Sequence, residues 1–357
     1  MRSIYFLLTN DCNLRCKYCF QERPQNDNPA FKTSESVIDA FAEYCRTEKI
    51  NDVQLFGGEP LFYKDLFIYC VTTLKKINPD IQIGLVTNGT LMDEETLDLI
   101  TKNEMSILLS LDGDRDTHNG MRGGFDNILK WVTNFNKKSR ISVALQAGRV
   151  DGLYENIKYV WDLDFANGVY VNVINNYDWY NESDIQTFEK EYEKAINGML
   201  NGDGILTCAL STFDIIDKSY QKTNTCGISA LGLASDWNGN LYPCQRAFEL
   251  GTEFCIGSIY SGIDSQKNES IRLDILNSIN QSASSDKYMV GTFCPVSLYQ
   301  KHKSFQGSWC DEFCRIIDIK AKLVAKYYYE IKEFNRKSKL NEGYSDQKSQ
   351  EIESQAL

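Results

Sequence analysis

Three cysteines stand within eight residues near the start of the sequence, in the stretch TNDCNLRCKYCFQ (residues 9–21). Cys12, Cys16 and Cys19 have the spacing C-x3-C-x2-C. A structural zinc site is closed by four protein ligands, whereas cysteine thiolates at close spacings in a loop hold iron–sulfur clusters. Three thiolates can bind three irons of a [4Fe–4S] cluster. The trio therefore predicts a cluster whose fourth iron is open to a ligand other than a cysteine of this loop.

The composition supports metal or redox chemistry in a reducing compartment. The chain of 357 residues has twelve cysteines but only two histidines, His118 and His302. Its first apolar run is too short for a signal peptide, and no apolar stretch is long enough to span a membrane. We therefore expect a cytoplasmic protein, in which cysteines bind metal rather than form disulfides. The net charge of −11 argues against a nucleic-acid or anionic-membrane partner.

The elements that must position the cysteine loop form an alternating series. Between residues 3 and 175, six apolar strand-like segments alternate with helix-like segments, the first of them capped by Thr33 or Ser34. Cys45 and Cys70 fall inside two of these helices and are expected to be core thiols. Six such units predict an α/β fold, with a parallel sheet curved into a partial (β/α)6 TIM-like barrel.

Polar motifs follow the first four predicted strands. The cysteine loop comes after the first strand, GGEP (57–60) after the second, TNGT (87–90) after the third and SLDGDRDTHNGMRGG (110–124) after the fourth. Because working residues of such barrels lie at the carboxyl ends of the strands, these motifs are expected to surround one site. Taken alone, His118 is expected to pack the loop rather than act as an acid or base.

The remaining chain predicts further units. We expect a core barrel over 1–178, a helical connector over 179–207 and a smaller cysteine-rich domain over 208–320. A terminal helix over 321–340 and a polar tail over 341–357, expected to be disordered, complete the chain. Within the cysteine-rich part, SDWNGNLYPC (235–244) predicts a hairpin with Asn-Gly at its turn.

The ordered motifs resemble the radical S-adenosylmethionine (radical SAM) superfamily over roughly residues 3 to 175. Tyr18, just before the third cysteine, matches the aromatic position that packs near the adenine. The resemblance implies that the GGEP segment (Gly57, Gly58, Glu59 and Pro60) holds the methionine amino group, and that Ser110 and Asp112 approach the ribose. Thr87 and Asn88 of TNGT join the cofactor-binding set, and Arg122 is the candidate for the methionine carboxylate or the cluster edge. SLDG followed by His118, Arg122 and GGF is typical of the peptide-modifying branch.

A second set of cysteines lies between residues 208 and 314. Its first half, C-x17-C with Gly239 five residues before Cys244, resembles the SPASM or twitch auxiliary-cluster domain of peptide maturases. Its second half departs from that pattern, because Ser297 stands where a cysteine is usual and no cysteine follows Cys314. We expect one auxiliary [4Fe–4S] cluster, and a zinc-stabilised hairpin is the alternative. The expected ligands are Cys226 and Cys244 with two of Cys294, Cys310 and Cys314, and Cys208 and Cys255 are spare candidates.

The resemblance implies an oxidoreductase that cleaves S-adenosyl-L-methionine to a 5′-deoxyadenosyl radical. The expected substrate is a ribosomally made precursor peptide, and the product a C–C (cyclophane-type) or thioether crosslink. Flavodoxin or ferredoxin is the expected electron donor. No leader-recognition domain is expected before residue 12, so the peptide docks directly or through a separate leader-binding protein. Gln245 replaces the aspartate that acts as base in anaerobic sulfatase-maturating enzymes, which disfavours formylglycine formation. A small-molecule radical dehydrogenase and a non-catalytic iron–sulfur or zinc protein are the alternatives.

Overall fold

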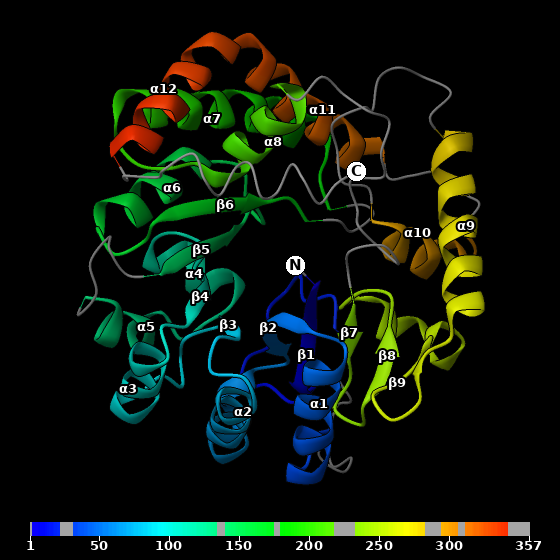
Figure 1. The fold of residues 1–357 in the computed structure, drawn as a ribbon. Coiled ribbons are helices and arrows are strands. Elements are labelled where there is room, and N and C mark those ends of the chain that lie inside the picture. Colours follow the sequence, from blue (N-terminus) through cyan, green and yellow to red (C-terminus); the bar gives the residue numbers. More distant parts are fainter. Residues whose placement is uncertain are drawn as a thin grey trace.

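A parallel sheet of six strands carries the first half of the molecule (Figure 1). The structure is a computed structural model that describes residues 2–21, 31–133, 140–174, 179–217, 233–282, 294–305 and 311–341. The predicted strand-like segments are all strands, and they lie side by side in chain order. Their bounds are β1 Arg2–Thr9, β2 Ile50–Gly57, β3 Gln82–Thr87, β4 Ser106–Ser110, β5 Ile141–Gln146 and β6 Gly168–Asn172.

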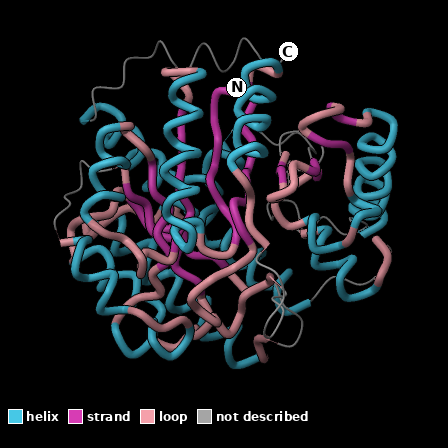
Figure 2. The backbone as a smooth tube through the Cα atoms, turned by 90° about the horizontal axis from the view of Figure 1, so that it is seen from below, coloured by secondary structure: helices cyan, strands magenta, loops and turns pink. Residues whose placement is uncertain are grey.

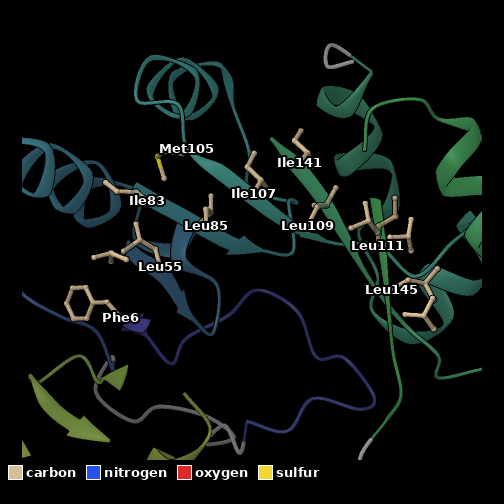
Figure 3. Close-up of a cluster of buried hydrophobic side chains, with 14 of the residues drawn as sticks. Phe6, Leu55, Ile83, Leu85, Met105, Ile107, Leu109, Leu111, Ile141 and Leu145 are labelled. Atoms are coloured by element: carbon tan, nitrogen blue, oxygen red, sulfur yellow. The ribbon is translucent and has the colours of Figure 1, made fainter. Parts of the chain in front are cut away.

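One row of side chains shows how the sheet is held in register. The parallel pairing aligns Phe6 with Leu55, Leu55 with Leu85, Leu85 with Ile107, and Ile107 with Ile141. All five side chains are buried, and Figure 3 shows them among neighbouring apolar side chains of the core. A slip by one residue would turn this row to the opposite face. The apolar pattern of the strands therefore fixes where each strand ends, and hence where the polar motifs lie.

Helices alternate with these strands and lie around the outside of the curved sheet (Figures 1 and 2). Helix α1 begins after Ser34, whose side chain accepts a hydrogen bond from the backbone N–H of Val37, so Ser34 rather than Thr33 is the cap. A short helix, α4, lies in the segment after β4 that was expected to be only a loop, and Asp114 caps it. The bounds are α1 Glu35–Thr47, α2 Lys64–Ile77, α3 Glu94–Lys102, α4 Arg115–Met121, α5 Phe125–Val132 and α6 Leu153–Asp162.

The predicted Asn-Gly hairpin extends the sheet beyond β1. Strand β7 (Ala234–Ser235) pairs parallel with β1, through Tyr5 and Phe6, and β8 (Asn240–Tyr242) pairs antiparallel with β7. The turn is closed by Asp236, whose Oδ1 accepts from the backbone N–H groups of Asn238 and Asn240, both at 2.9 Å. The short strands β9 (Gly257–Ser258) and β10 (Gly262–Ile263) continue the sheet to its edge.

The other helices follow the barrel in the chain, and two expectations need correction. The helix expected over 321–340 is two helices that meet at Tyr327, whose hydroxyl donates to Glu193 Oε1 on α7 at 2.8 Å. The expected boundary between 207 and 208 falls inside α8, and the tail beyond residue 341 lies outside the described residues. The bounds are α7 Glu182–Asn201, α8 Thr207–Asp217, α9 Ser265–Ser282, α10 Pro295–His302, α11 Asp311–Lys326 and α12 Tyr328–Asn341, with 3-10 turns η1 Pro60–Tyr63, η2 Ala247–Leu250 and η3 Thr252–Phe254.

The α/β fold with a parallel sheet is thus confirmed. Within the described part of the chain, no helix combines the length and the apolar character that crossing a bilayer requires.

The core thiols generate a first prediction. Cys70 is fully buried in α2 and Cys45 is 1% exposed in α1. Replacing Cys70 by Ala leaves a small cavity and should lower the free energy of unfolding by about 1 kcal/mol. The iron content per chain after anaerobic reconstitution should stay at the wild-type value, whereas Cys12→Ala should reduce it. A loss of iron in Cys70→Ala without unfolding would contradict the assignment of Cys70 to the core.

Candidate active site around the cysteine loop

The cysteine trio lies in the irregular loop that follows β1. Cys12 is 9% exposed, and Cys16 and Cys19 are half-buried. The loop folds back on itself, because the backbone N–H of Cys19 donates to the carbonyl of Cys16 at 3.1 Å. Burial raises the pKa of the Cys16 thiol, as do Cys19 and Cys12 beside it, while the Arg122 guanidinium lowers it. The three sulfurs are therefore close enough to influence one another, next to a cation.

The GGEP backbone anchors this loop. The N–H of Gly58 donates to the carbonyl of Thr9 at 2.7 Å, and the N–H of Glu59 donates to the carbonyl of Asp11 at 2.8 Å. A Cβ on Gly58 would lie 2.1 Å from the Asp11 oxygen, and one on Gly57, at a φ of +141°, would lie 2.2 Å from the Thr9 oxygen. Both positions require glycine because the two backbones touch. Pro60 then opens the turn η1.

The carboxylate of Glu59 connects the second and third strand ends. Glu59 is buried, and its Oε1 accepts from Thr87 Oγ1 at 2.7 Å and from the N–H of Leu61 at 3.1 Å. Its Oε2 accepts from the N–H of Asn88 at 2.7 Å. These three donors fix the position of the carboxylate. Whether Glu59 contacts a methionine amino group, as the resemblance implies, stays a prediction.

The side chain of Asn88 faces the cysteine loop. Its Nδ2 donates to Asn13 Oδ1 at 3.0 Å and approaches Cys12 Sγ at 3.7 Å. Its Oδ1 accepts from Thr90 Oγ1 at 2.6 Å, and Asn13 in turn donates to that hydroxyl at 2.7 Å. The N–H of Leu14 also donates to Cys12 Sγ, at 3.4 Å. Two N–H donors therefore point at the Cys12 sulfur, an arrangement that stabilises a thiolate.

A buried ion pair lies at the end of β4. Arg122 Nε donates to Asp112 Oδ2 at 2.9 Å, and the two side chains are 8% and 0% exposed. Asp112 Oδ2 also accepts from the Tyr18 hydroxyl, and its Oδ1 accepts from the N–H of Gln146 at 3.0 Å. The Arg122 guanidinium lies 5.1 Å from the centre of the Tyr18 ring. The structure therefore brings together three of the predicted site residues.

The electrostatics of this cluster follow from its burial. Burial, and then the Asp112 carboxylate, raise the pKa of Tyr18 above its ordinary value, so the phenol stays protonated and can donate. Burial alone would lower the pKa of Arg122, but Asp112 leads the groups that raise it, so the guanidinium stays charged. Half-buried Ser110 lies at the end of β4, opposite Ala144 of β5. The predicted contacts of Asp112 and Ser110 with a ribose, and of Arg122 with a carboxylate, remain predictions.

His118 packs the loop, as its position alone suggested. Its side chain is fully buried on α4. Its Nδ1 accepts from the N–H of Asp112 at 3.2 Å, and its Nε2 lies 3.1 Å from the carbonyl of Gly123. This pair of contacts requires the neutral imidazole with the proton on Nε2. Burial lowers the pKa of His118 from 6.5 to about 4, with the nearby Arg122 lowering it further and Asp112 opposing the shift.

The sequence did not single out Trp179 as part of this site. The Trp179 ring meets that of Tyr18 edge-on, with 6.2 Å between the ring centres, and its Nε1 donates to the carbonyl of Gly148 at 3.1 Å. Gly148 follows β5, and a Cβ at this position would lie 3.3 Å from the Tyr18 ring. An aromatic residue after the last strand of the barrel was the available signal, but no local motif marks it.

The structure describes five of the seven cysteines in the second set. Cys244 follows β8, and Cys294 directly precedes α10. The thiol of Cys208 instead lies 3.2 Å from the hydroxyl of the fully buried Tyr192 on α7, in a separate environment. Cys314 is buried on α11, and Cys255 Sγ lies 3.1 Å from the carbonyl of Gly257. Cys226 and Cys310 lie outside the described residues.

The donor set of the first loop fits an iron–sulfur cluster. In the described ranges of the chain, no three His, Cys, Asp or Glu side chains converge on one point as ligands of a single metal ion do. A cluster takes one thiolate on each iron, so its ligands stand farther apart. Cys12, Cys16 and Cys19 supply three thiolates, two N–H groups point at Cys12, and the backbone of GGEP fixes the loop. These residues fit the cluster that the sequence predicts.

A comparison with known families decides the identity of this region. Residues 6–163 match the family model of the radical SAM superfamily. This part of the chain is a radical SAM domain. The match runs from Phe6 of β1 through α6, so it covers the first five strands, and it contains the cysteine loop, GGEP, TNGT and the Asp112–Arg122 pair.

Curated proteins match shorter stretches of the chain. An uncharacterised protein of Methanocaldococcus jannaschii (MJ0907) is 32% identical over 117 residues, which is 32% of this chain and 39% of that protein. A GTP 3′,8-cyclase of Campylobacter lari is 29% identical over 132 residues, 36% of this chain and 39% of that enzyme. Each alignment thus spans about two fifths of the relative.

Two solved structures are similar in fold over nearly the whole chain. One, described as native anSMEcpe with bound AdoMet, has a TM-score of 0.76 at 17% identity and covers 93% of this chain and 100% of its own. Another, the same protein with bound AdoMet and the Cp18Cys peptide, has a TM-score of 0.71 at 18% identity and covers 92% and 99%. At these identities the likeness concerns the fold, and it extends beyond residue 163 into the region of the second cysteine set.

The contact between GGEP and the cysteine loop generates a second prediction. Gly58→Ala places a Cβ against the Asp11 carbonyl and must push the loop away, so the reconstituted protein should hold fewer irons per chain. Gly120→Ala is the matched control, because a Cβ at Gly120 on α4 meets nothing within 4 Å. Iron and sulfide analysis with circular dichroism of the fold measures the difference. Equal iron content in both variants would contradict the anchoring role.

The buried imidazole of His118 leads to a third prediction, which concerns the pH dependence of stability. Between pH 6.5 and about 4, the unfolded chain binds a proton at this residue that the folded chain does not, so stability falls as the pH falls. Lowering the pH from 6.5 to about 5 should cost the wild type about 2 kcal/mol through this group. His118→Gln should lack that loss, and exposed His302 provides the control variant His302→Gln. Unfolding of the metal-free protein at both pH values measures it, and a difference between wild type and His118→Gln that does not change with pH would refute it.

Proposed function

We propose that this protein is a radical SAM oxidoreductase that modifies a ribosomally made precursor peptide by an oxidative crosslink. The observation that carries this proposal is the pairing of β7 with β1. It places the hairpin that leads to Cys244 directly beside the strand that leads to Cys12. Because β8 runs antiparallel to β7 and ends opposite Ala234, Cys244 emerges level with the first half of β1. A second redox centre built on the later cysteines would therefore lie on the same sheet as the first site rather than in a remote domain.

The likeness in fold adds support for a peptide substrate. It covers more than nine tenths of this chain, including the region after the barrel, and one such structure, that of native anSMEcpe, has a bound Cp18Cys peptide. The site in this chain differs from anaerobic sulfatase-maturating enzymes at Gln245, where their base is an aspartate. We therefore propose a C–C (cyclophane-type) or thioether crosslink rather than formylglycine.

The residues of this chain would hold two kinds of group. Cys12, Cys16 and Cys19 would bind a [4Fe–4S] cluster, with S-adenosyl-L-methionine near Tyr18, Glu59, Asn88 and Arg122. Cys244 and Cys294, with Cys226, Cys310 or Cys314, would bind an auxiliary [4Fe–4S] cluster. When bound, the first cluster supplies one electron that cleaves the cosubstrate to methionine and a 5′-deoxyadenosyl radical, which takes a hydrogen atom from the substrate.

Atoms and electrons balance in the proposed crosslinking reaction. The substrate loses one hydrogen atom to 5′-deoxyadenosine, then one proton and one electron as the new bond forms. The electron that leaves the substrate balances the one that cleaved the cosubstrate, so the substrate is oxidised by two electrons. The chain's share is to hold the reacting groups, with Arg122 and Tyr18 fixed by Asp112, and to exclude water from this buried network.

A small-molecule substrate is the second candidate. The curated relatives include GTP 3′,8-cyclases, one of which is 29% identical over 132 residues. Such an enzyme would need no surface for a peptide and no precursor gene. A protein that only binds iron–sulfur or zinc centres is the third, and it would not cleave the cosubstrate at all.

The proposed setting follows from the chemistry. A cytoplasmic location would keep the twelve cysteines reduced. A flavodoxin or ferredoxin would deliver the electron, and a separate protein could present the leader of the peptide.

The decisive assay is anaerobic reconstitution followed by measurement of 5′-deoxyadenosine and methionine. We expect wild-type protein to form both with a chemical reductant, and Cys16→Ala to form neither. Cys45→Ala, in which a core thiol is removed, is the matched control and should retain activity. A peptide encoded beside the gene should increase turnover and lose two hydrogens in mass.

The outcomes separate the candidates. Stimulation by a nucleotide or sugar instead of the peptide would favour the second candidate. Absence of 5′-deoxyadenosine from a protein that holds its full iron content would leave only the third.

A further inference from the structure

Arg246 lies between the two cysteine sets and contacts Phe20, beside the first set, and Cys294 of the second. Its Nη1 donates to the sulfur of Cys294 at 3.3 Å. The centre of its guanidinium lies 4.5 Å from the centre of the Phe20 ring, and Phe20 directly follows Cys19. The next residue, Ala247, donates its backbone N–H to the carbonyl of Cys244 at 3.1 Å. The Arg246 side chain therefore joins the first cysteine loop to Cys294, and the backbone beside it contacts Cys244.

One N–H group of the Arg246 guanidinium has no hydrogen-bond acceptor among the described residues. Arg246 Nε is buried, and no atom of the described residues accepts a hydrogen bond from it. A buried guanidinium N–H without an acceptor costs free energy, so such a group usually has a partner. The sulfur of Cys294 is already an acceptor of the neighbouring Nη1. A further sulfur acceptor at the same place, as the sulfides of an iron–sulfur centre would provide, fits this orphan donor.

The position of the cation is fixed from the opposite side. The Phe20 ring stacks on Phe56 of β2, with 6.3 Å between ring centres and 8° between planes, and Phe56 meets Tyr5 of β1 edge-on at 6.0 Å. Arg246 therefore rests on an aromatic ring that is itself packed against the sheet. A cation over an aromatic face gains electrostatic attraction there. The arrangement holds the charge in place next to Cys294.

We propose that Arg246 is a positioning residue that raises the reduction potential of an auxiliary iron–sulfur centre with Cys294 as a ligand. This rests on the auxiliary cluster of the proposed function. Reduction adds one negative charge to the centre, and a cation that donates to its sulfur stabilises the reduced state more than the oxidised one. A higher potential makes the centre a better acceptor for the electron that the substrate radical loses.

The test isolates this centre in the full-length chain. Cys12, Cys16 and Cys19 are each replaced by Ala, so that iron bound after reconstitution reports the later cysteines. Arg246→Met is compared with this parent, and Arg246→Lys keeps the charge but loses the planar fork. Arg272→Met is the matched control, because Arg272 pairs with Glu269 on the exposed side of α9. Midpoint potentials are measured by redox titration followed by electron paramagnetic resonance.

We expect Arg246→Met to make reduction at least tenfold less favourable, which is about 59 mV for one electron. Arg246→Lys should fall between Met and the parent, and Arg272→Met should match the parent. An unchanged potential in Arg246→Met at equal iron content would overturn the inference. If Arg246→Met assembles no cluster, Arg246→Lys decides: a lowered potential supports the role, and an unchanged potential overturns it.

Failure of the proposed function gives a different result. A parent that binds no iron–sulfur centre overturns the inference and the auxiliary cluster together, while the wild type can still form 5′-deoxyadenosine. A wild type that forms no 5′-deoxyadenosine, but whose later centre responds to Arg246 as expected, overturns the catalytic proposal and leaves the inference standing.

Discussion

The cysteine loop depends on close contact between two backbones. It has no helix or strand of its own, and its shape is set where the N–H groups of Gly58 and Glu59 meet the carbonyls of Thr9 and Asp11. This contact exists because β1 and β2 are parallel neighbours that end together at Thr9 and Gly57. Gly57 and Gly58 leave no room for a side chain, because a Cβ at either position would lie 2.2 or 2.1 Å from a carbonyl oxygen of the β1 end. The register of an apolar sheet thereby determines where three thiols stand.

Electrostatics complete the site among buried side chains. Asp112 and Arg122 are both buried, and breaking such a pair by removing one partner typically costs about 3–5 kcal/mol. The carboxylate also holds Tyr18, so one pair positions an aromatic ring beside the loop and a cation beside Cys16. His118 helps to hold Asp112 in place, because its Nδ1 accepts a hydrogen bond from the Asp112 backbone N–H. The polar network is therefore a scaffold for the loop as well as a candidate binding surface.

The sequence predicted those features of the site that depend on local sequence patterns. Six buried strands with polar residues after them have a clear pattern, and the hairpin turn at Asn238 and Gly239 has its own signal. The short helix α4 was missed because its polar residues carry no apolar stripe, and its cap at Asp114 is the only mark. Contacts such as Trp179 with Tyr18, or Arg246 with Cys294, join residues far apart in the chain. Only the folded chain reveals such pairs, because neither partner has a distinctive neighbourhood in sequence.

The central claim is that one iron of the first cluster is left for a small molecule, since only three thiolates serve it. The most direct measurement is electron paramagnetic resonance of the reduced, anaerobically reconstituted protein before and after addition of S-adenosyl-L-methionine, in a chain whose Cys244 and Cys294 are replaced by Ala. An open iron predicts that the spectrum of the reduced cluster changes when the cosubstrate coordinates it. A spectrum that stays the same at saturating cosubstrate would contradict the claim.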